Sequence, residues 1–133
     1  MIDHIDHLVV TTRDLQGCLH FYCDVLGMQL EQFVAADGGT RVAVKFGAQK
    51  FNIHEWGKEF EPRAHVAAPG TLDICLLASV TLEEVIAKFK ESNVPIILGP
   101  VMRTGATSPI RSVYVRDPDL NLVEISVTRA PPE

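Results

Sequence analysis

Two strand-like segments each carry a residue that could ligate a metal ion. Glu124 interrupts the apolar run 122–127, and His7 interrupts the run 6–10. Because side chains alternate across a strand, each would point away from its apolar neighbours. A carboxylate in such a strand is unfavourable unless it is paired or bound to a cation. An imidazole and carboxylates together suit Mn²⁺, Fe²⁺, Zn²⁺ or Mg²⁺, so we treat His7 and Glu124 as a candidate metal site.

An internal repeat nominates further residues. Asp73 lies 66 residues after His7, and Asn52 aligns with Glu124 when the two halves of the chain are compared. His54 falls on the same strand face as Asn52, so it could also line a cleft or bind substrate. Amides are uncommon metal ligands, so Asn52 could line a ligand site instead. Each of these residues could also be an ordinary surface or hydrogen-bonded side chain.

The segment around Arg103 offers a different chemistry. The connection 99–109 is predicted to be long and flexible, and able to fold over the site. Arg103 could hold an anionic substrate there, or it could be a solvated loop charge. Trp56 and Phe60 could line the mouth of a cleft or close a seam between subunits.

The elements that position these residues are predicted from the same repeat. Apolar residues at i, i+3, i+4 and i+7 indicate one helix from Leu15 and a second from Leu82, 67 residues later. Asp14 or Thr12 can cap the first helix, and Thr81 with Glu84 forms a capping box at the second. The residues suited to end the helices are Gly27 and Asn93.

Extended runs flank both helices in the same order. They are predicted at about residues 6–10, 28–34, 40–46, 50–55, 72–77, 95–98, 111–115 and 122–127. The sequence therefore predicts an α+β fold of two paired βαβββ modules that form a curved mixed sheet around a cleft. We expect one domain over 1–133, with module one at 1–56, a linker at 57–70 and module two at 71–128.

Composition limits the possible partners. The 133 residues include 47% apolar and 22% charged residues and carry a formal net charge of −5, without long runs of one sign, so nucleic acid and membrane are not expected partners. No signal-peptide pattern starts the chain, and its three cysteines show no disulfide or zinc spacing, so we expect a cytoplasmic protein. Motifs for nucleotide binding and serine hydrolysis are missing from the sequence.

Several motifs carry a family resemblance that covers nearly the whole chain. They are the segments 5–10, 21–22, 25–28, 115–119 and 121–124. The chain resembles the vicinal oxygen chelate superfamily, which contains glyoxalase I, extradiol dioxygenases, and fosfomycin and bleomycin resistance proteins. Segments 46–50, 52–54, 59–62, 99–101 and 103–106 are closest to the glyoxalase domain-containing protein 5 group and its bacterial virulence-associated relatives.

The resemblance implies a homodimer with metal ligands on inward-facing strands. The family ligand positions correspond to His7, Asn52, Asp73 and Glu124. Asn52 and Asp73 stand where glyoxalase I has a glutamate and a histidine, and Asp73 also departs from the dioxygenase pattern. The fold expectation is unaffected by these departures, whereas the choice of reaction is left open.

Two functions follow as hypotheses. The first is a divalent-metal-dependent enzyme, with Mn, Fe, Ni, Co or Zn bound by His7, Asp73 and Glu124, that acts on a small oxygen-rich substrate as a lyase, isomerase or ring-cleaving dioxygenase. Resemblance to glyoxalase I suggests that Glu124 would shuttle a proton. The second is a metal-free protein that binds or sequesters a small molecule, as bleomycin resistance members do. The presence of Asn52 favours this alternative.

Overall fold

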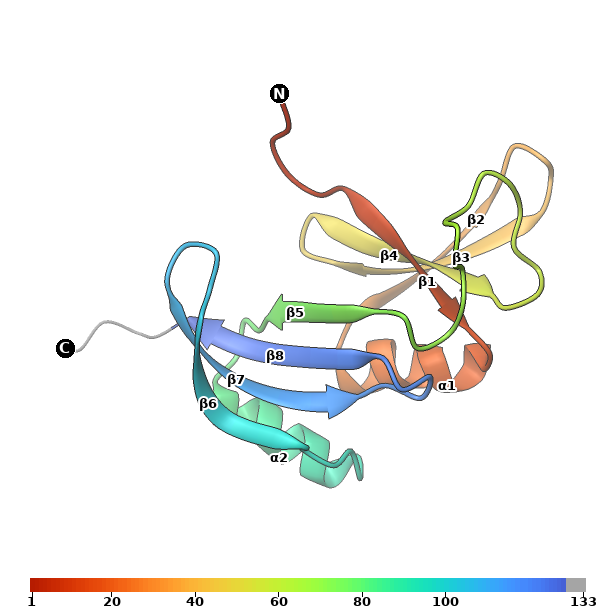
Figure 1. Ribbon diagram of the computed structural model, residues 1–133. Coiled ribbons are helices and arrows are strands. Elements are labelled where there is room, and N and C mark those ends of the chain that lie inside the picture. Colours follow the sequence, from red (N-terminus) through yellow and green to blue (C-terminus); the bar gives the residue numbers. More distant parts are fainter. Residues whose placement is uncertain (129–133) are drawn as a thin grey trace. The chain divides into compact units, whose positions relative to one another are not determined.

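The computed structural model describes residues 1–128 and divides the chain into two compact units, Met1–Thr71 and Leu72 onwards. Figure 1 shows a four-stranded sheet in each unit. Residues 129–133, which the predicted domain includes, lie outside the described part. Within residues 1–128, no helix combines the length and the apolar character that crossing a bilayer requires.

Each unit repeats one order of elements. The first contains β1 (His7–Thr12), α1 (Leu15–Leu19), the π-helical segment η1 (His20–Val25), β2 (Gln29–Val34), β3 (Thr40–Phe46) and β4 (Gln49–Glu55). The second contains β5 (Asp73–Leu77), α2 (Leu82–Glu91), β6 (Leu98–Thr104), β7 (Pro109–Arg116) and β8 (Leu122–Thr128). The sheets have the orders β1-β4-β3-β2 and β5-β8-β7-β6, with the first pair of each parallel and the others antiparallel. The predicted α+β fold with a doubled βαβββ order is confirmed.

The helices begin and end where the sequence indicates. The Asp14 carboxylate accepts a hydrogen bond from the Gly17 amide at 3.1 Å, and the Thr81 hydroxyl accepts one from the Glu84 amide at 3.2 Å. Gly27 and Asn93 follow the helices with φ of 78° and 57°, the left-handed conformation that these two residue types tolerate best. The first helix has the expected extent but not the expected geometry, because beyond Leu19 it continues as the wider π-helical segment η1.

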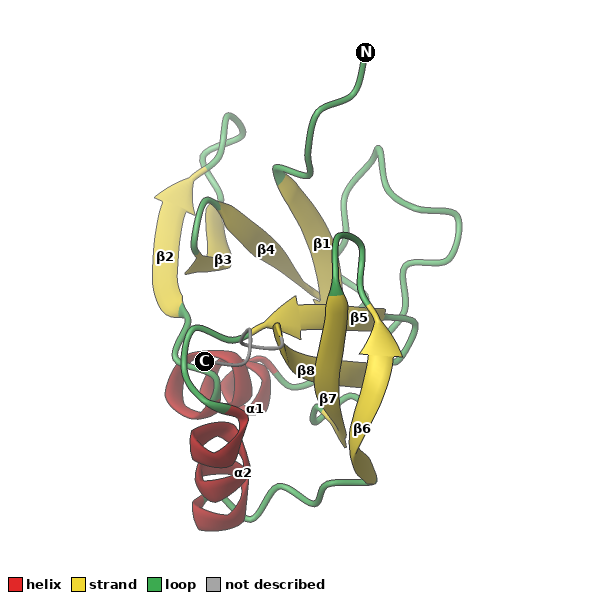
Figure 2. Ribbon diagram, turned by 90° about the vertical axis from the view of Figure 1, so that its left-hand side faces the viewer, coloured by secondary structure: helices red, strands yellow, loops and turns green. Residues whose placement is uncertain are grey.

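One face of each sheet packs on helical residues and forms the core. In the first unit the Tyr22 ring of η1 meets the Phe51 ring of β4 edge-on at 5.7 Å. In the second unit Leu82 and Phe89 of α2 are buried, as are Val113 and Val123 of the sheet. Figure 2 shows β6 and β7 as a long hairpin with α2 to one side. The alternating residues of every strand therefore point to the other face, which we call the polar face of the sheet.

The prediction for segment 95–109 was wrong. The strand predicted at 95–98 is β6, which begins at Leu98 and continues to Thr104, so Arg103 lies in a strand and not in a flexible connection. Gly99 and Pro100 lie where the register of β6 against β7 shifts, between Leu98 and Val101. The ladder tolerates both residues at this irregularity and resumes beyond them.

A buried carboxylate organises the turn between β7 and β8. Asp117 accepts hydrogen bonds from the amides of Asp119 and Asn121, both at 2.9 Å. The Asn121 side chain donates to Asp117 Oδ2 at 2.7 Å and accepts from the Leu72 amide at 2.9 Å. This network connects the turn with the residue that precedes β5, and so helps to set the start of the strand that carries Asp73.

Leu120 in this turn should be replaceable by glycine with a gain in stability. Its φ is 68°, a conformation that is unfavourable for a side chain with a Cβ, and its side chain is 67% exposed. Glycine relieves this cost but loses more backbone entropy on folding, so we expect Leu120→Gly to raise the free energy of unfolding by about 0.5–1 kcal/mol in urea denaturation. A destabilised variant would show that the Leu120 side chain makes a contribution larger than its backbone strain.

Candidate functional site

The sequence-predicted site residues lie on the polar faces of the two sheets. In the first sheet His7 pairs with Lys50, two residues before Asn52 on β4. In the second sheet Asp73 pairs with Leu122, two residues before Glu124 on β8. The two registers match, so His7 and Asp73 are structural equivalents, as are Asn52 and Glu124. Each sheet thus brings two of the four candidates onto one face of adjacent strands.

His7 has one ring nitrogen engaged. Its Nδ1 lies 2.8 Å from Oδ2 of Asp6, and its side chain is 45% exposed. The hydrogen bond to His7 is the main reason why the pKa of Asp6 is lowered, so Asp6 carries a negative charge next to the imidazole. A carboxylate on one imidazole nitrogen orients the ring and makes the other nitrogen a better ligand, an arrangement typical of metal-binding histidines. His7 can therefore offer Nε2 to a metal ion.

Glu124 is held by buried hydroxyl groups. Ser112 Oγ donates to Glu124 Oε2 at 2.6 Å, and Ser126 Oγ lies 2.6 Å from Ser112 Oγ. Both serines are fully buried. Cys75, directly opposite Glu124 on β5, extends the chain with its Sγ 3.3 Å from Ser126 Oγ. The thiol of Cys75 is only partly withdrawn from water, and this desolvation is the main cause that raises its pKa, so Cys75 stays protonated at neutral pH and acts as a hydrogen-bonding group.

Sequence reasoning missed Ser112 and Ser126. Ser126 is two residues beyond Glu124, and Ser112 lies opposite Ser126 on β7. The signal that could have found them is a small polar residue alternating with valine and isoleucine in each strand. Their pairing depends on the register of β7 against β8, which a single sequence does not specify.

Arg103 and Asp73 complete the candidates of the second sheet. Arg103 Nε donates to the Tyr114 hydroxyl at 3.0 Å, and Tyr114 lies directly opposite Glu124. Arg103 is exposed and its guanidinium also lies over the Tyr114 ring, 5.6 Å from its centre. Asp73 is exposed at the start of β5. The arginine is thus anchored on the polar face by the tyrosine next to Glu124.

Asn52 and His54 belong to a separate cluster in the first sheet. Phe60 of the segment after β4 packs on the His54 ring at 4.9 Å and on the Arg41 guanidinium at 4.1 Å. Asn52 Oδ1 and Arg41 Nε are buried and have no hydrogen-bond partner within residues 1–128. A buried polar atom without a partner costs about 1–3 kcal/mol, so these two atoms require an explanation.

His54 is neutral in this cluster. Burial is the main cause that lowers its pKa, the positive charge of Arg41 lowers it further, and Glu59 acts in the opposite direction. Because the folded protein binds this proton less readily than the unfolded chain, stability falls as the pH drops through about 6.5, the ordinary pKa of histidine.

The acid sensitivity of folding should therefore depend on His54. We expect the melting temperature of the wild type to fall more between pH 7.5 and 5.5 than that of His54→Gln, measured by calorimetry. His20→Gln, which changes an exposed histidine paired with Asp24, is the control and should retain the fall of the wild type. Equal falls in the wild type and His54→Gln would contradict the assignment.

The donor groups fit a divalent metal ion only in part. Within residues 1–128 no group of three or more His, Cys, Asp or Glu side chains could hold a metal. His7 and Asn52 are close neighbours in one sheet, and Asp73 and Glu124 in the other. An imidazole nitrogen with carboxylate and amide oxygens is nevertheless a donor set suited to Mn, Fe, Co, Ni or Zn, and His7 and Glu124 are both oriented by neighbours.

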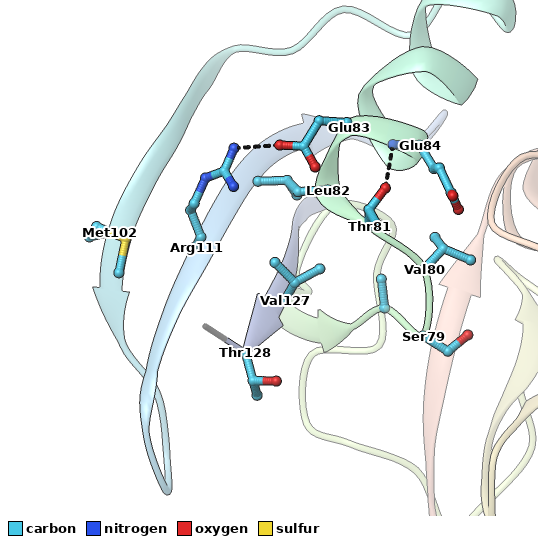
Figure 3. A pocket seen from close by; sticks show the side chains of 11 residues that line it. Ser79, Val80, Thr81, Leu82, Glu83, Glu84, Met102, Arg111, Val127 and Thr128 are labelled. Carbon is cyan, nitrogen blue, oxygen red and sulfur yellow. Dashed lines mark hydrogen bonds and ion pairs between the residues drawn. The ribbon is translucent and has the colours of Figure 1, made fainter. Parts of the chain in front are cut away.

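An open pocket of about 910 Å³ lies elsewhere in the second unit. It is lined by the start of α2 and by core-side residues of the sheet, among them Met102, Arg111 and Val127 (Figure 3). Arg111 donates to Glu83 at 2.9 Å across it. None of the sequence-predicted site residues lines this pocket, so we do not assign the chemistry to it.

Comparisons with known proteins identify relatives along most of the chain. A family model described as the glyoxalase/bleomycin resistance protein/dioxygenase superfamily matches residues 4–125. Virulence protein STM3117 of Salmonella typhimurium is 44% identical over 126 residues, which are 95% of this chain and 85% of the relative. Glyoxalase domain-containing protein RDO1 of Mycosarcoma maydis is 45% identical over 122 residues, 92% of this chain and only 66% of the relative.

Solved structures agree with the fold. The crystal structure of STM3117 superposes with a TM-score of 0.90 at 43% identity, covering 97% of this chain and 99% of that chain. Two structures below 25% identity share the fold alone. The first is a lactoylglutathione lyase from Agrobacterium tumefaciens, which superposes with a TM-score of 0.67 over 96% of this chain and 95% of that chain. The second is the antibiotic-binding protein TnmS3 from Streptomyces, with a TM-score of 0.72 over 96% of this chain and 98% of that chain.

Proposed function

Since the chain belongs to the glyoxalase/bleomycin resistance protein/dioxygenase superfamily, we propose that it is a divalent-metal-dependent enzyme acting on a small oxygen-rich substrate. The ion would be Mn, Fe, Ni, Co or Zn. The reaction would be that of a lyase, an isomerase or a ring-cleaving dioxygenase. The protein would act as a cytoplasmic homodimer.

The support for this proposal comes mainly from the way that His7 and Glu124 are held. Asp6 engages one nitrogen of His7, and Ser112 engages one oxygen of Glu124. In each residue a neighbour orients the side chain while a second ligating atom remains to be used. Metal ligands commonly have such a neighbour that orients them.

Each residue has a role in this account. His7, Asp73 and Glu124 would hold the ion, which when bound polarises adjacent substrate oxygens as a Lewis acid. Glu124 would take the proton from the hydroxyl-bearing carbon next to a substrate carbonyl and return it to the carbonyl carbon, while the hydroxyl proton passes to the former carbonyl oxygen, so that the substrate is isomerised without net change in protons. Ser112 would keep the carboxylate in position, and Arg103, whose Nε donates to the Tyr114 hydroxyl, would bind an anionic part of the substrate.

A second candidate is a protein that binds a small molecule without a metal. One observation favours it. Asn52 occupies a position where a carboxylate would be a better ligand for a metal ion. The fold is compatible with this function, because an antibiotic-binding protein shares it.

Chelation separates the two candidates. The protein would be assayed for isomerisation of a glutathione hemithioacetal and for ring cleavage of a catechol, as purified, after EDTA treatment, and after reconstitution with each of the five metals. Turnover that EDTA abolishes, that one metal restores and that Glu124→Ala lacks is the expected result. Tight binding of either compound by the EDTA-treated protein, with no turnover under any condition, would favour the metal-free binder.

A further inference from the structure

The proposed reaction leaves one cluster of the first unit unused. Arg41, Asn52 and His54 lie together on the polar face of β3 and β4, with Phe60 packed over two of them. Asn52 lies directly opposite Ala43 in the sheet, and Arg41 is two residues before Ala43 on the same face. The cluster therefore contains one unpartnered donor, Arg41 Nε, and one unpartnered acceptor, Asn52 Oδ1, on the same face of two adjacent strands.

The free edge of the Arg41 guanidinium is well defined. Nη2 donates to Asp37 Oδ2 at 2.7 Å, and the guanidinium carbon lies over the Phe60 ring, 4.1 Å from its centre. Stacking engages the face of a guanidinium and leaves its in-plane N–H groups for oxygen acceptors. Asp37 is 63% exposed and pairs with Nη2, so Nε–H takes no part in this ion pair. A negatively charged oxygen is the best partner for Nε–H in these surroundings.

Asn52 lacks the hydrogen-bonding neighbours that Glu124, its counterpart in the second unit, has. Its cross-strand neighbours on the two sides are Val9 and Ala43, which have only methyl groups to offer. In the second unit Glu124 holds the equivalent position, and Ser112 and Ser126 surround its carboxylate with hydroxyls. Arg41 and His54 replace those serines in the first unit. The acceptor of Asn52 is thus left for a group that is not part of the described chain.

We infer that this cluster binds a small hydroxycarboxylate, with its carboxylate on Arg41 Nε–H and its hydroxyl donating to Asn52 Oδ1. A carboxylate alone would satisfy only the arginine, and an alcohol only the asparagine. Phe60 keeps water from the guanidinium, which strengthens the charge-assisted hydrogen bond. The inference deepens the proposed function by naming a substrate class, but this binding mode uses no metal ion.

NMR of the ¹⁵N-labelled full chain tests this mode directly. Glycolate, acetate and ethylene glycol would be titrated into the protein as purified and after EDTA treatment, following the Arg Nε–H and Asn side-chain signals. The Arg41 signal is identified by its loss in Arg41→Lys. We expect glycolate to move this signal with and without EDTA, and to bind at least tenfold more tightly than acetate or ethylene glycol.

Two variants separate the contributions of the two residues. Arg41→Lys should weaken glycolate at least tenfold, and Asn52→Ala should reduce the affinity for glycolate to that for acetate. Arg116→Lys, which changes an arginine that donates to the Leu120 carbonyl in the other unit, is the matched control and should bind as the wild type does. Should Arg41→Lys fail to fold, the affinities of Asn52→Ala for glycolate and acetate still test the inference.

The result of the glycolate titration does not depend on whether the protein binds a metal ion. Glycolate binding that disappears with EDTA, equal affinities for glycolate and acetate, or an unmoved Arg41 signal would each overturn the inference. If the protein proves metal-free but glycolate still moves the Arg41 signal, the inference stands while the proposed enzyme fails. If metal is bound and the Arg41 signal never moves, the inferred glycolate site fails while the proposed metal-dependent enzyme stands.

Discussion

Replacing Glu124 with alanine is expected to weaken the binding of a divalent ion roughly a hundredfold or more. The variant loses the only ionised group of β8 on the polar face, together with the hydrogen bond from Ser112. The His7→Ala variant should behave in the same way, because it removes the imidazole that Asp6 orients. Calorimetric titration of the EDTA-treated proteins with Mn²⁺, Co²⁺, Ni²⁺ and Zn²⁺ measures both effects.

Matched variants show whether the loss is specific. Glu91→Ala removes an exposed carboxylate at the end of α2 and should bind metal as the wild type does. Ser112→Ala keeps the Glu124 carboxylate but removes its hydrogen bond, so its affinity should fall by less, roughly tenfold. Equal affinities in Glu124→Ala and Glu91→Ala would show that any bound metal lies elsewhere.

Replacing Asn121 with alanine should lower the free energy of unfolding by about 3 kcal/mol. The side chain is buried and makes two hydrogen bonds, one to the carboxylate of Asp117 and one from the amide of Leu72. Its removal takes a partner from a buried negative charge and leaves a cavity beside it. Urea denaturation of the EDTA-treated protein gives this difference directly.

Thr71→Ala is the control for that measurement. The Thr71 hydroxyl donates to the Ala68 carbonyl at 2.9 Å, but it is exposed, so water replaces the bond and the cost should stay below about 1 kcal/mol. A loss in Asn121→Ala no greater than in Thr71→Ala would mean that the turn before β8 does not depend on this network.

The fold could be predicted because local signals agreed with the repeat. The i, i+3, i+4, i+7 spacings from Leu15 and Leu82 specify two helices, and Gly27 and Asn93 end them in the conformation that these residues favour. Segment 98–104 could not be predicted, because Gly99 and Pro100 usually interrupt a strand. Here the shift of register against β7 accommodates them, and that shift is a property of the assembled sheet.

The site residues could be predicted only where the alternation of side chains along a single strand identifies them. The strand pattern places His7, Asp73 and Glu124 opposite their apolar neighbours, and the matching registers of the two sheets agree with this placement. Arg41 and Ser112 were not predicted, because their roles arise from partners across strands or from the segment that carries Phe60. Sequence spacing within one strand contains no information on such contacts.

Elemental analysis of the untagged wild-type protein, beside His7→Ala and Glu124→Ala, tests the central claim most directly. Near-stoichiometric Mn, Fe, Ni, Co or Zn in the wild type, absent from both variants, is the predicted result. A wild type that stays empty after incubation with all five ions, or variants that retain as much metal as the wild type, would contradict the proposed metal site.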